Sequence, residues 1–499
     1  MELKKHHILL ILIFLFSIAF RLFFAFQTPY FSNDNSYFVL RQVDYISKTG
    51  LPLYDDPLSY SGRNLPFTPF FQYILAFFNL FLPLNIVGKI IPNILASTII
   101  FVAYLIVFEI TKNRRAAVAI ALTSAFIPIF IRETVNSVSD FSIVIPILLF
   151  IIYFLLKIDE SKKYVVLLLV MITLLVLTSP IFVVLLLGLI FYFLLLKTEK
   201  IGHERDELEI ILFSGFLYFW FNFIIFKKAF LLYGPGIIWQ NIPNILLSTY
   251  FFDINILESV YAVGVIPFIF GIFIIYTFVF KQKNKAIYLL TSLALSVFIL
   301  LWLKLLPFVS GLIFLGSFLV LLLGQYIKSF LTYIEKSKFS RRTNLFFGLF
   351  ILLIFITSLV PCILYSLNSV EKAPSKEMID ALDFIKHNTE QNSVVLGSIA
   401  EGHLITYFSE RKNVIDSDFL LIRDINQRIP DIDKIYTTIY KTDAIKLLNK
   451  YSINYIILSN ETMTRYKITD LKYYDTECFN LVYDNKVKIY QSLCKLEAD

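Results

Sequence analysis

Long apolar runs separated by short polar stretches fill the first three quarters of the chain. A helix needs roughly 20 mostly apolar residues to cross about 30 Å of hydrocarbon. The runs of that kind predict eleven membrane-spanning helices, at residues 8–26, 86–109, 116–131, 141–156, 164–178, 181–196, 209–226, 259–280, 286–303, 308–326 and 345–367. The apolar stretch 69–82 is too short for a further span, and we expect an interfacial or re-entrant helix there.

Lys and Arg residues test this count independently, because they are enriched in cytoplasmic loops. With eleven spans, six basic clusters share the side of the N-terminus, at 4–5, 112–115, 157–163, 197–205, 281–285 and 328–342. Only Lys227-Lys228 falls on the opposite side. We therefore expect a cytoplasmic N-terminus, a first external loop at 27–68, a second at 227–258 and an external tail.

The tail has a different pattern, in which short helical and strand signals alternate. Apolar residues at helical spacing predict helices at 375–387, 402–409 and 443–451. Short apolar runs predict strands at 393–396, 413–415 and 453–458, followed by a hairpin of 478–483 with 486–490. Alternating helices and strands favour a partly parallel sheet. The chain is thus predicted to combine a multi-span α-helical membrane domain, 1–367, with a C-terminal extracytoplasmic α/β domain, 368–499.

Composition supports the membrane assignment. Of the 499 residues, 57% are hydrophobic and 17% aromatic, well above the values of soluble domains. The net charge of +7 does not indicate nucleic-acid binding, because the Lys and Arg residues lie between the apolar runs. Few Gly residues and many Ile, Phe, Lys and Asn residues indicate an AT-rich prokaryotic, archaeal genome, and hence the plasma membrane.

Three cysteines and the absence of common motifs narrow the chemistry. Cys362 falls in the last predicted span and is expected to pack as a small apolar residue. Cys478 and Cys494 flank the predicted hairpin on the external side, where they either form a disulfide or stay free. The sequence contains no Cys/His cluster with metal-ligand spacing, no glycine-rich phosphate loop and no Ser-His-Asp order. Soluble-enzyme chemistries therefore receive little support.

Polar residues next to the predicted spans are the candidates for a site. The first is Asp34, in an unusually long first loop; the alternative is a solvated carboxylate or an N-cap for a helix at 35–46. The second is Asp140, which follows Arg132 and is equally explained as a cap of the next span. Carboxylates at the mouth of a helix bundle are costly unless they face a polar cavity, so two of them suggest one shared cavity.

The first external loop carries an Asn-Asp pair, a Tyr, an Arg and a Gly-x-Pro turn in that order: Asn33-Asp34, Tyr37, Arg41 and Gly50-Leu51-Pro52. Together with the many spans and the external α/β tail, this order resembles the type C (GT-C) membrane glycosyltransferases, and most of all the catalytic subunits of oligosaccharyltransferases; protein O-mannosyltransferases are a related group. In the tail, 381–386, 393–396 and 405–412 resemble segments that flank the Trp-Trp-Asp-Tyr-Gly motif of that family. The resemblance covers nearly the full length.

The resemblance implies transfer of a sugar or oligosaccharide from a polyprenyl-phosphate or polyprenyl-diphosphate donor to a protein or glycolipid acceptor on the external face. It gives Asp34 the role of catalytic carboxylate, with Asp140 assisting. The same two residues would bind Mg²⁺ or Mn²⁺ if the reaction uses a metal. Residues implied at the donor phosphate are Arg41, Arg132 and Lys304, although Lys304 is equally explained by snorkelling to the interface. Residues implied on the acceptor side are Glu258, Glu401 and His403.

The chain departs from the family pattern at two motifs. Ser398-Ile399-Ala400-Glu401-Gly402 stands in place of Trp-Trp-Asp-Tyr-Gly, which puts recognition of an Asn-x-Ser/Thr acceptor in doubt. Val138-Ser139-Asp140 stands in place of a second Asp-x-Asp, so one metal-ligating carboxylate is missing. Asp416-Ser417-Asp418 spells Asp-x-Asp but follows a strand, and we interpret it as a turn. Two other functions stay open: a non-catalytic relative that binds glycolipid, and a membrane transporter or flippase.

Overall fold

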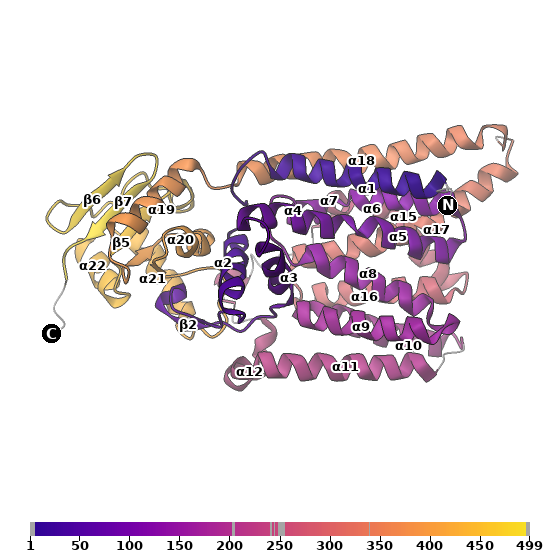
Figure 1. Ribbon diagram of the computed structural model, residues 1–499, viewed down its shortest axis with the longest axis horizontal. Helices are drawn as coiled ribbons and strands as arrows, with labels where there is room; N and C mark the ends of the chain where they lie inside the picture. The colour runs from indigo at the N-terminus through magenta and orange to yellow at the C-terminus, as the bar shows by residue number, and fades with distance from the viewer. Residues whose placement is uncertain are drawn as a thin grey trace. The chain divides into compact units, whose positions relative to one another are not determined.

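A computed structural model describes residues 5–201, 205–239, 242–243, 245–247, 255–338 and 340–495 (Figure 1). Contacts between Cα atoms divide the chain into two compact units. The helical unit comprises Met1–Pro29, Thr68–Ile225 and Ser248–Glu371. The mixed unit comprises Tyr30–Phe67, Phe226–Leu247 and Lys372–Asp499. Part of the predicted external loop 227–258 falls outside the described residues. The predicted boundary near residue 367 stays a prediction.

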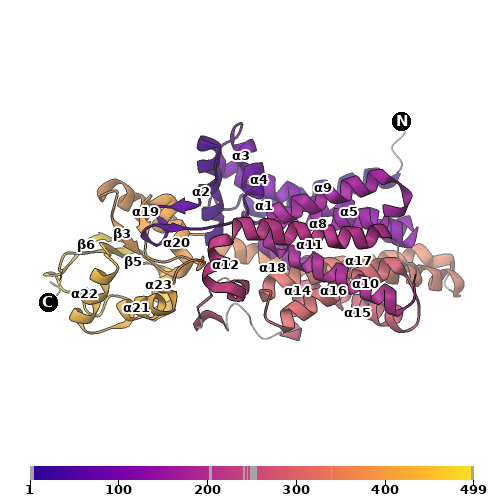
Figure 2. The ribbon, with the colours of Figure 1, turned by 90° about the horizontal axis from the view of Figure 1, so that it is seen from below.

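The helical unit is built from fifteen helices among the described residues: α1 (Lys5–Ala25), α3 (Phe70–Asn79), α4 (Leu84–Ser97), α5 (Ile99–Thr111), α6 (Arg114–Ala125), α7 (Pro128–Thr134), α8 (Phe141–Leu156), α9 (Lys162–Thr178), α10 (Val183–Thr198), α11 (Arg205–Ile225), α14 (Ile256–Val263), α15 (Val265–Phe280), α16 (Lys285–Trp302), α17 (Phe308–Lys336) and α18 (Thr343–Glu371). Most of the long ones run side by side along one direction (Figures 1 and 2). Each of the eleven predicted spans coincides with a helix or with a pair of consecutive helices.

The number of membrane spans is established less exactly than the sequence predicts it. Among the described residues, seven helices are long and apolar enough to cross a membrane, or nine if each of two bent pairs is one span. The pair α6 and α7 bends by 42°, and the pair α14 and α15 by 103° at Gly264, whose φ of 99° favours glycine. The stretch predicted to be interfacial or re-entrant contains α3, an apolar helix of ten residues. The exact count of eleven stays a prediction.

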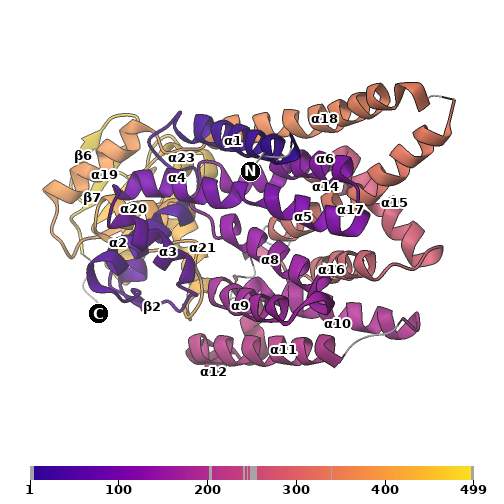
Figure 3. The same ribbon diagram turned by 45° about the vertical axis from the view of Figure 1, so that its right-hand side comes forward.

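Helix α11 shows why this unit suits lipid better than water. It lies at the margin of the bundle (Figure 3). It exposes large apolar side chains along its length. Phe216, Phe219 and Trp220 are 62%, 66% and 57% exposed. Apolar surface of this size is unfavourable in water, because water solvates it poorly. In the hydrocarbon of a membrane the same surface carries no such free-energy cost.

The mixed unit contains a five-stranded sheet with strand order β4-β3-β5-β7-β6. Its strands are β3 (Val394–Leu396), β4 (Lys412–Asn413), β5 (Tyr455–Leu458), β6 (Phe479–Asp484) and β7 (Lys488–Ser492). Strand β3 runs parallel to β4 and β5, whereas β7 is antiparallel to β5 and β6. The helices of the tail are α19 (Lys376–Asn388), α20 (Gly402–Phe408), α21 (Ile425–Thr437), α22 (Lys441–Lys450) and α23 (Asn460–Tyr466).

The predicted elements of the tail are confirmed within a few residues. Ser375 caps α19 as expected, because its side chain accepts a hydrogen bond from the Met378 amide. Two helices were not predicted, α21 and α23. Helix α21 contains Pro430, which normally signals a helix end, yet its Ile429, Ile432 and Ile435 are buried. Packing of this apolar face therefore outweighs the local signal.

The segment Tyr30–Phe67 belongs to the mixed unit through its own small elements. These are α2 (Asp34–Thr49), β1 (Asp55–Asp56), the 3-10 turn η1 (Ser59–Ser61) and β2 (Arg63–Asn64). Strands β1 and β2 pair antiparallel. The chain also contributes α12 (Lys227–Tyr233) and the 3-10 segment η4 (Gly234–Trp239) to this unit.

The cysteines fulfil both parts of the prediction. Cys478 and Cys494 form a disulfide, which settles the alternative left open by the sequence. Cys362 is free and fully buried in α18. It therefore behaves as a packing residue, as its position in an apolar run indicates.

Candidate functional site

Asp34 is the first residue of helix α2, but its side chain forms hydrogen bonds with the start of helix α20. The N-cap of α2 is Asn33, whose side chain accepts from the Asn35 amide. The two carboxylate oxygens of Asp34 accept from the backbone amides of His403 and Leu404, at 3.1 and 2.8 Å. Asp34 thus satisfies the first amides of α20, which have no partner within that helix. It is neither a solvated carboxylate nor the cap of its own helix.

Burial makes the carboxyl group of Asp34 an unusually weak acid. It raises the pKa of Asp34 from its ordinary 3.8 to about 7, although His403 and the two backbone hydrogen bonds oppose the shift. A carboxyl group whose pKa is shifted towards neutrality in this way suits proton transfer. Its role as the catalytic carboxylate stays a prediction.

Glu401 also serves the start of α20. Ser398 and Glu401 form a capping box, in which the Glu401 carboxylate accepts from the Ser398 amide at 3.3 Å. Glu401 is only 8% exposed, and burial raises its pKa to about 7. In the mixed unit this side chain faces the protein interior. Its predicted role on the acceptor side is untested.

His403 joins two carboxylates into a buried cluster. Its Nε2 lies 3.1 Å from Asp418 Oδ2 and 3.7 Å from Asp416 Oδ1. Burial lowers the pKa of His403, but the negative charges of Asp416, Asp418 and Asp34 outweigh it, so the net shift is upward. Because the imidazolium form is favoured by these carboxylates, His403 links Asp34 electrostatically to the Asp416–Asp418 segment.

Arg63 completes this cluster from the first loop. Its Nη2 lies 3.1 Å from Asp416 Oδ1 and 3.9 Å from Asp418 Oδ2, and its Nη1 donates to the Asp418 carbonyl. Burial opposes ionisation of Asp416, yet Arg63 and His403 hold the pKa of Asp416 below its usual value. The side chains of Arg63 and Asp416 are 3% and 0% exposed. This pair is a buried ion pair.

We tested whether His403, Asp416 and Asp418 would hold a metal. One ligand atom from each lies within 4.8 Å of the others, and imidazole with two carboxylates suits a divalent ion. However, the oxygens of Asp416 already accept from four donors of the protein: Ser59 Oγ, Arg63 Nη2, Asn413 Nδ2 and the Asp418 amide. A carboxylate has about four acceptor sites, so Asp416 is saturated without an ion. The cluster does not fit a metal in this arrangement.

Arg41 is paired as well. It forms an ion pair with Asp56, whose Oδ1 accepts from the Leu58 amide at 2.9 Å. The side chains are 12% and 1% exposed, and burial lowers the pKa of Arg41 to about 10. This pair stabilises the loop that holds Asp56, and the predicted role of Arg41 at the donor phosphate stays a prediction.

Asp140 lies in the helical unit, just before α8. It occupies the N-cap position with helical backbone angles, and no capping hydrogen bond from its side chain is seen. Burial raises the pKa of Asp140 to about 6, although a hydrogen bond with the Ser179 side chain opposes the shift. The predicted role of Asp140 in the reaction stays a prediction. Asp34 and Asp140, the predicted metal pair, belong to different units.

Two predicted residues meet in the helical unit. Arg132 lies 3.9 Å from Glu258 and 3.3 Å from Glu133, and its guanidinium sits over the ring of Tyr365 at 5.6 Å. Arg132 and Glu258 were assigned to the donor and the acceptor, respectively. Lys304 follows α16 with an exposed side chain and a φ of 54°. Its role at the phosphate stays a prediction.

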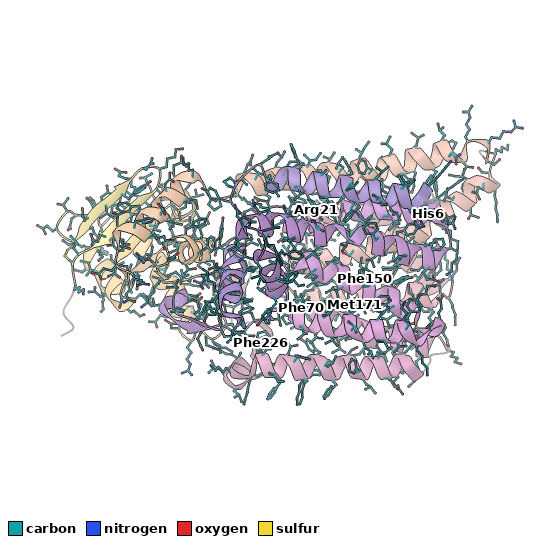
Figure 4. The ribbon with its side chains drawn as sticks, viewed as in Figure 1. His6, Arg21, Phe70, Phe150, Met171 and Phe226 are labelled. Atoms are coloured by element: carbon teal, nitrogen blue, oxygen red, sulfur yellow. A yellow bond between two sulfur atoms is a disulfide. The ribbon has the colours of Figure 1, made fainter. Side chains whose placement is uncertain are left out.

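The helical unit also buries two cations that the sequence reading did not single out. Arg21 (labelled in Figure 4) is fully buried on α1, donates to Thr134 Oγ1 at 2.8 Å and lies 5.1 Å from the ring of Phe130. Lys89, 2% exposed on α4, donates to the Thr28 carbonyl at 3.1 Å and bonds Asn136. The sequence offered one signal for both residues, a single cation within a long apolar run. A cation is costly within a membrane, so such a position indicates a functional residue.

Arg63, Asp56 and Asp416 were not among the predicted site residues. The separation in sequence explains this, because Arg63 and Asp416 are 353 residues apart. The one available signal was Asp416-Ser417-Asp418, which was interpreted as a turn on its position after a strand. The turn is confirmed, because Asp416 Oδ1 accepts from the Asp418 amide at 3.0 Å, and the Asp416 carboxylate is in addition fully buried.

Comparisons with known proteins identify the fold. No model of a known protein family matches the chain, and no curated protein does. Among solved structures, the Archaeoglobus fulgidus oligosaccharyltransferase in the apo form matches with a TM-score of 0.69 at 16% identity, over 94% of this chain and 72% of that one. The same organism's AglB, in complex with an inhibitory peptide and a dolichol-phosphate, matches with a TM-score of 0.67 at 16% identity, over 92% and 70%.

A second kind of neighbour covers both chains almost completely. ArnT from Cupriavidus metallidurans, bound to undecaprenyl phosphate, matches with a TM-score of 0.54 at 11% identity, over 97% of this chain and 99% of that one. The chain has the fold of GT-C membrane glycosyltransferases. The resemblance drawn from the sequence is confirmed at this level, and with it the assignment to multi-pass membrane proteins.

Proposed function

We propose that the protein is a membrane glycosyltransferase that transfers a sugar or oligosaccharide from a polyprenyl-phosphate or -diphosphate donor to an acceptor on the external face of the plasma membrane. The carrying observation is the shared fold over nearly the whole chain with ArnT, which was solved with undecaprenyl phosphate. AglB, solved with a dolichol-phosphate, adds a second lipid-phosphate binder of this fold.

The apolar helical unit supports a lipid-linked donor. A polyprenyl chain stays in hydrocarbon, so the enzyme that uses it must present its site at the membrane. Exposed apolar faces such as that of α11 suit this environment. The transfer breaks the bond between the anomeric carbon and the phosphate oxygen, and the leaving phosphate keeps the electron pair. The acceptor oxygen or nitrogen forms the new bond and loses a proton.

We propose that Asp34 accepts the proton that the acceptor loses. The pKa of about 7 places it near the optimum for a general base at neutral pH. Each of its oxygens accepts one backbone amide, which leaves a second acceptor site on each for a substrate hydroxyl or amide. Arg132 and Lys304 are our candidates for stabilising the negative charge of the leaving phosphate. Asp140 is proposed to assist, and Glu258 and His403 to contact the acceptor.

The test uses purified protein in lipid nanodiscs with radiolabelled dolichyl-phosphate and undecaprenyl-phosphate sugars. We expect release of the lipid phosphate together with labelled acceptor, and a loss of at least 100-fold for Asp34→Asn. Asp44→Asn is the matched control, because Asp44 is a half-exposed carboxylate on the same helix, paired with Lys48. Undiminished transfer by a correctly folded Asp34→Asn protein would refute the assignment of Asp34.

One observation favours a second candidate, a non-catalytic relative that binds glycolipid. Both oxygens of Asp34 serve as a cap for α20, a role that needs no reaction. In that case the nanodisc assay shows saturable binding of polyprenyl-phosphate sugars without release of lipid phosphate. Asp34→Asn would then lower the stability of the mixed unit and leave no turnover to lose.

A further inference from the structure

A basic cavity lies within the mixed unit. It has a volume of about 620 Å³ and is formed by the turn after η1, by α12, by the loop 421–424 and by the first turn of α21. Cavities of about 300–1,000 Å³ are typical of small-molecule sites. The charged residues of its wall are Arg63, Lys228, Arg423, Asp424 and Arg428.

The charges of this wall do not balance. Asp424 is neutralised by Arg428, which donates to its Oδ2 from Nε at 3.0 Å and from Nη2 at 2.9 Å. Arg63 is paired with Asp416, behind the wall. Lys228 and Arg423 are exposed, and neither forms an ion pair with any residue in the described part of the chain. Two positive charges therefore face the cavity without a counter-charge.

The two fixed arginines are held in place before any ligand arrives. The ring of Tyr60 lies 4.8 Å from the Arg63 guanidinium and 5.3 Å from that of Arg428. Arg428 also donates to the Val414 carbonyl at 2.9 Å. The Nε of Arg63, whose side chain is 3% exposed, has no hydrogen-bond partner among the described residues. Unpaired buried donors are rare in native proteins and are commonly satisfied by an ordered water or an ion.

Backbone strain around Tyr60 supports the same conclusion. Tyr60 and Ser61 have φ values of 50° and 63°, in a region that side chains rarely adopt. Asn413 and Asp416 hold Tyr60 there, because its amide donates to Asn413 Oδ1 at 2.6 Å and its hydroxyl to the Asp416 carbonyl at 2.8 Å. Non-glycine residues in this conformation persist where the surrounding structure over-determines them, and they cluster at ligand sites.

We propose that this cavity binds a phosphate group carried by the acceptor substrate. The assignment to the acceptor rests on the proposed glycosyl transfer. Guanidinium groups recognise phosphate oxygens through paired hydrogen bonds, and the two unbalanced cations supply the attraction. A series of direct contacts connects the cavity wall with Asp34. Arg63 contacts Asp416, and Asp416 contacts His403. The His403 amide donates to Asp34.

The first arm of the test measures binding alone. Inorganic phosphate is titrated into the intact protein in nanodiscs, with heat or hydrogen exchange of the peptides that contain 60–64 and 421–428 as the signal. We expect saturable binding that weakens at least tenfold in the double variant Lys228→Gln/Arg423→Gln, both exposed positions. Lys446→Gln, an exposed lysine of α22 outside the cavity, is expected to bind like the wild type. Equal binding by the double variant, or no binding by the wild type, would overturn the proposal.

The second arm identifies the source of the phosphate. With a phosphorylated glycolipid acceptor and its dephosphorylated form, we expect the double variant to raise the KM of the phosphorylated acceptor about tenfold and to abolish the preference for it. A rise in the KM of the donor instead would show that the site holds the donor phosphate, and would overturn the assignment to the acceptor. Phosphate binding that depends on Lys228 and Arg423 without any turnover supports the site and contradicts the proposed function.

Discussion

The two units bury charge in different ways. In the helical unit, Arg21 is fully buried with Thr134 and Phe130 as partners, and its Nε and Nη2 have no hydrogen-bond partner among the described residues. In the mixed unit, the equally buried Asp416 faces Arg63 and His403 and accepts four hydrogen bonds. The buried charge of Asp416 is compensated by ion pairs, whereas that of Arg21 has no ion-pair partner among the described residues.

Removing a paired buried charge and removing an unpaired one should change stability in different ways. A compensated pair contributes little net stability, but losing one partner exposes the full cost of the other charge. An uncompensated cation lowers stability from the start, so removing it costs little. Charged residues kept under these conditions within membrane helices are typical of functional positions.

The largest effect is expected for Arg63→Met. It leaves Asp416 buried without its main counter-charge, and we expect a loss of about 3–5 kcal/mol in the free energy of local opening. Hydrogen exchange of the segment 398–418 in the intact protein measures this energy. The control is Lys486→Met, which breaks a surface pair with Glu377 and should change it by less than about 0.5 kcal/mol. A change as small for Arg63→Met would contradict the comparison.

Removing the disulfide should have the next largest effect. Cys478 and Cys494 are 16 residues apart, and closing a loop of this length stabilises the folded state by about 3 kcal/mol. The double variant Cys478→Ser/Cys494→Ser should lose protection against hydrogen exchange in β6 and β7. Reductant should produce the same loss in the wild type and have no effect on the variant.

The pH dependence of stability tests the buried carboxylates. Because the pKa of Glu401 rises from 4.5 to about 7 on folding, the folded chain holds a proton in this window that the unfolded chain has released. Stability therefore falls as pH rises from 4.5 to 7, by roughly 3 kcal/mol for this group.

Glu401→Gln should flatten that slope in the exchange of 398–408, while Asp34 keeps a slope of the same sign. The amide oxygen of Gln still accepts from the Ser398 amide, so the capping box survives. Glu410→Gln, an exposed carboxylate of the same unit, serves as the control. If Glu401→Gln left the pH dependence of stability unchanged, burial would not be what raises the pKa of Glu401.

The smallest change is expected for Arg21→Met, and it should have the opposite sign. Met has a similar length and needs no counter-charge, so we expect unchanged stability or a gain of about 1 kcal/mol in thermal melting of the nanodisc sample. A loss of several kcal/mol would place a compensating partner beside Arg21 and remove the contrast between the units.

The fold was predictable where the signal is local. Each apolar run of the helical unit coincides with helices, because burial in lipid depends on composition over one segment. Ser375 and the hairpin of β6 and β7 were likewise found from neighbouring residues. Helix α21 was missed because its apolar face outweighs Pro430 only when packed against the rest of the unit.

The site was predictable only in part, for the same reason. Asp34 was identified from the unusual loop that carries it. His403 was expected on the acceptor side, but the hydrogen bonds of Asp34 with the His403 and Leu404 amides were not predicted. The pairs Arg41 with Asp56 and Arg63 with Asp416 depend on how the first loop folds, and the latter pair spans 353 residues. No spacing rule relates positions as far apart as Arg63 and Asp416, so neither residue was singled out from the sequence.

The capping of α20 by Asp34 has a consequence for synthesis. The amide that Asp34 binds lies 369 residues further along the chain. At about 5–20 residues per second, Asp34 leaves the ribosome roughly 20–70 s before its partner. Through this interval Asp34 lacks the amides that it binds in the folded protein. The cap that Asp34 places on α20 can therefore form only after the tail has been synthesised.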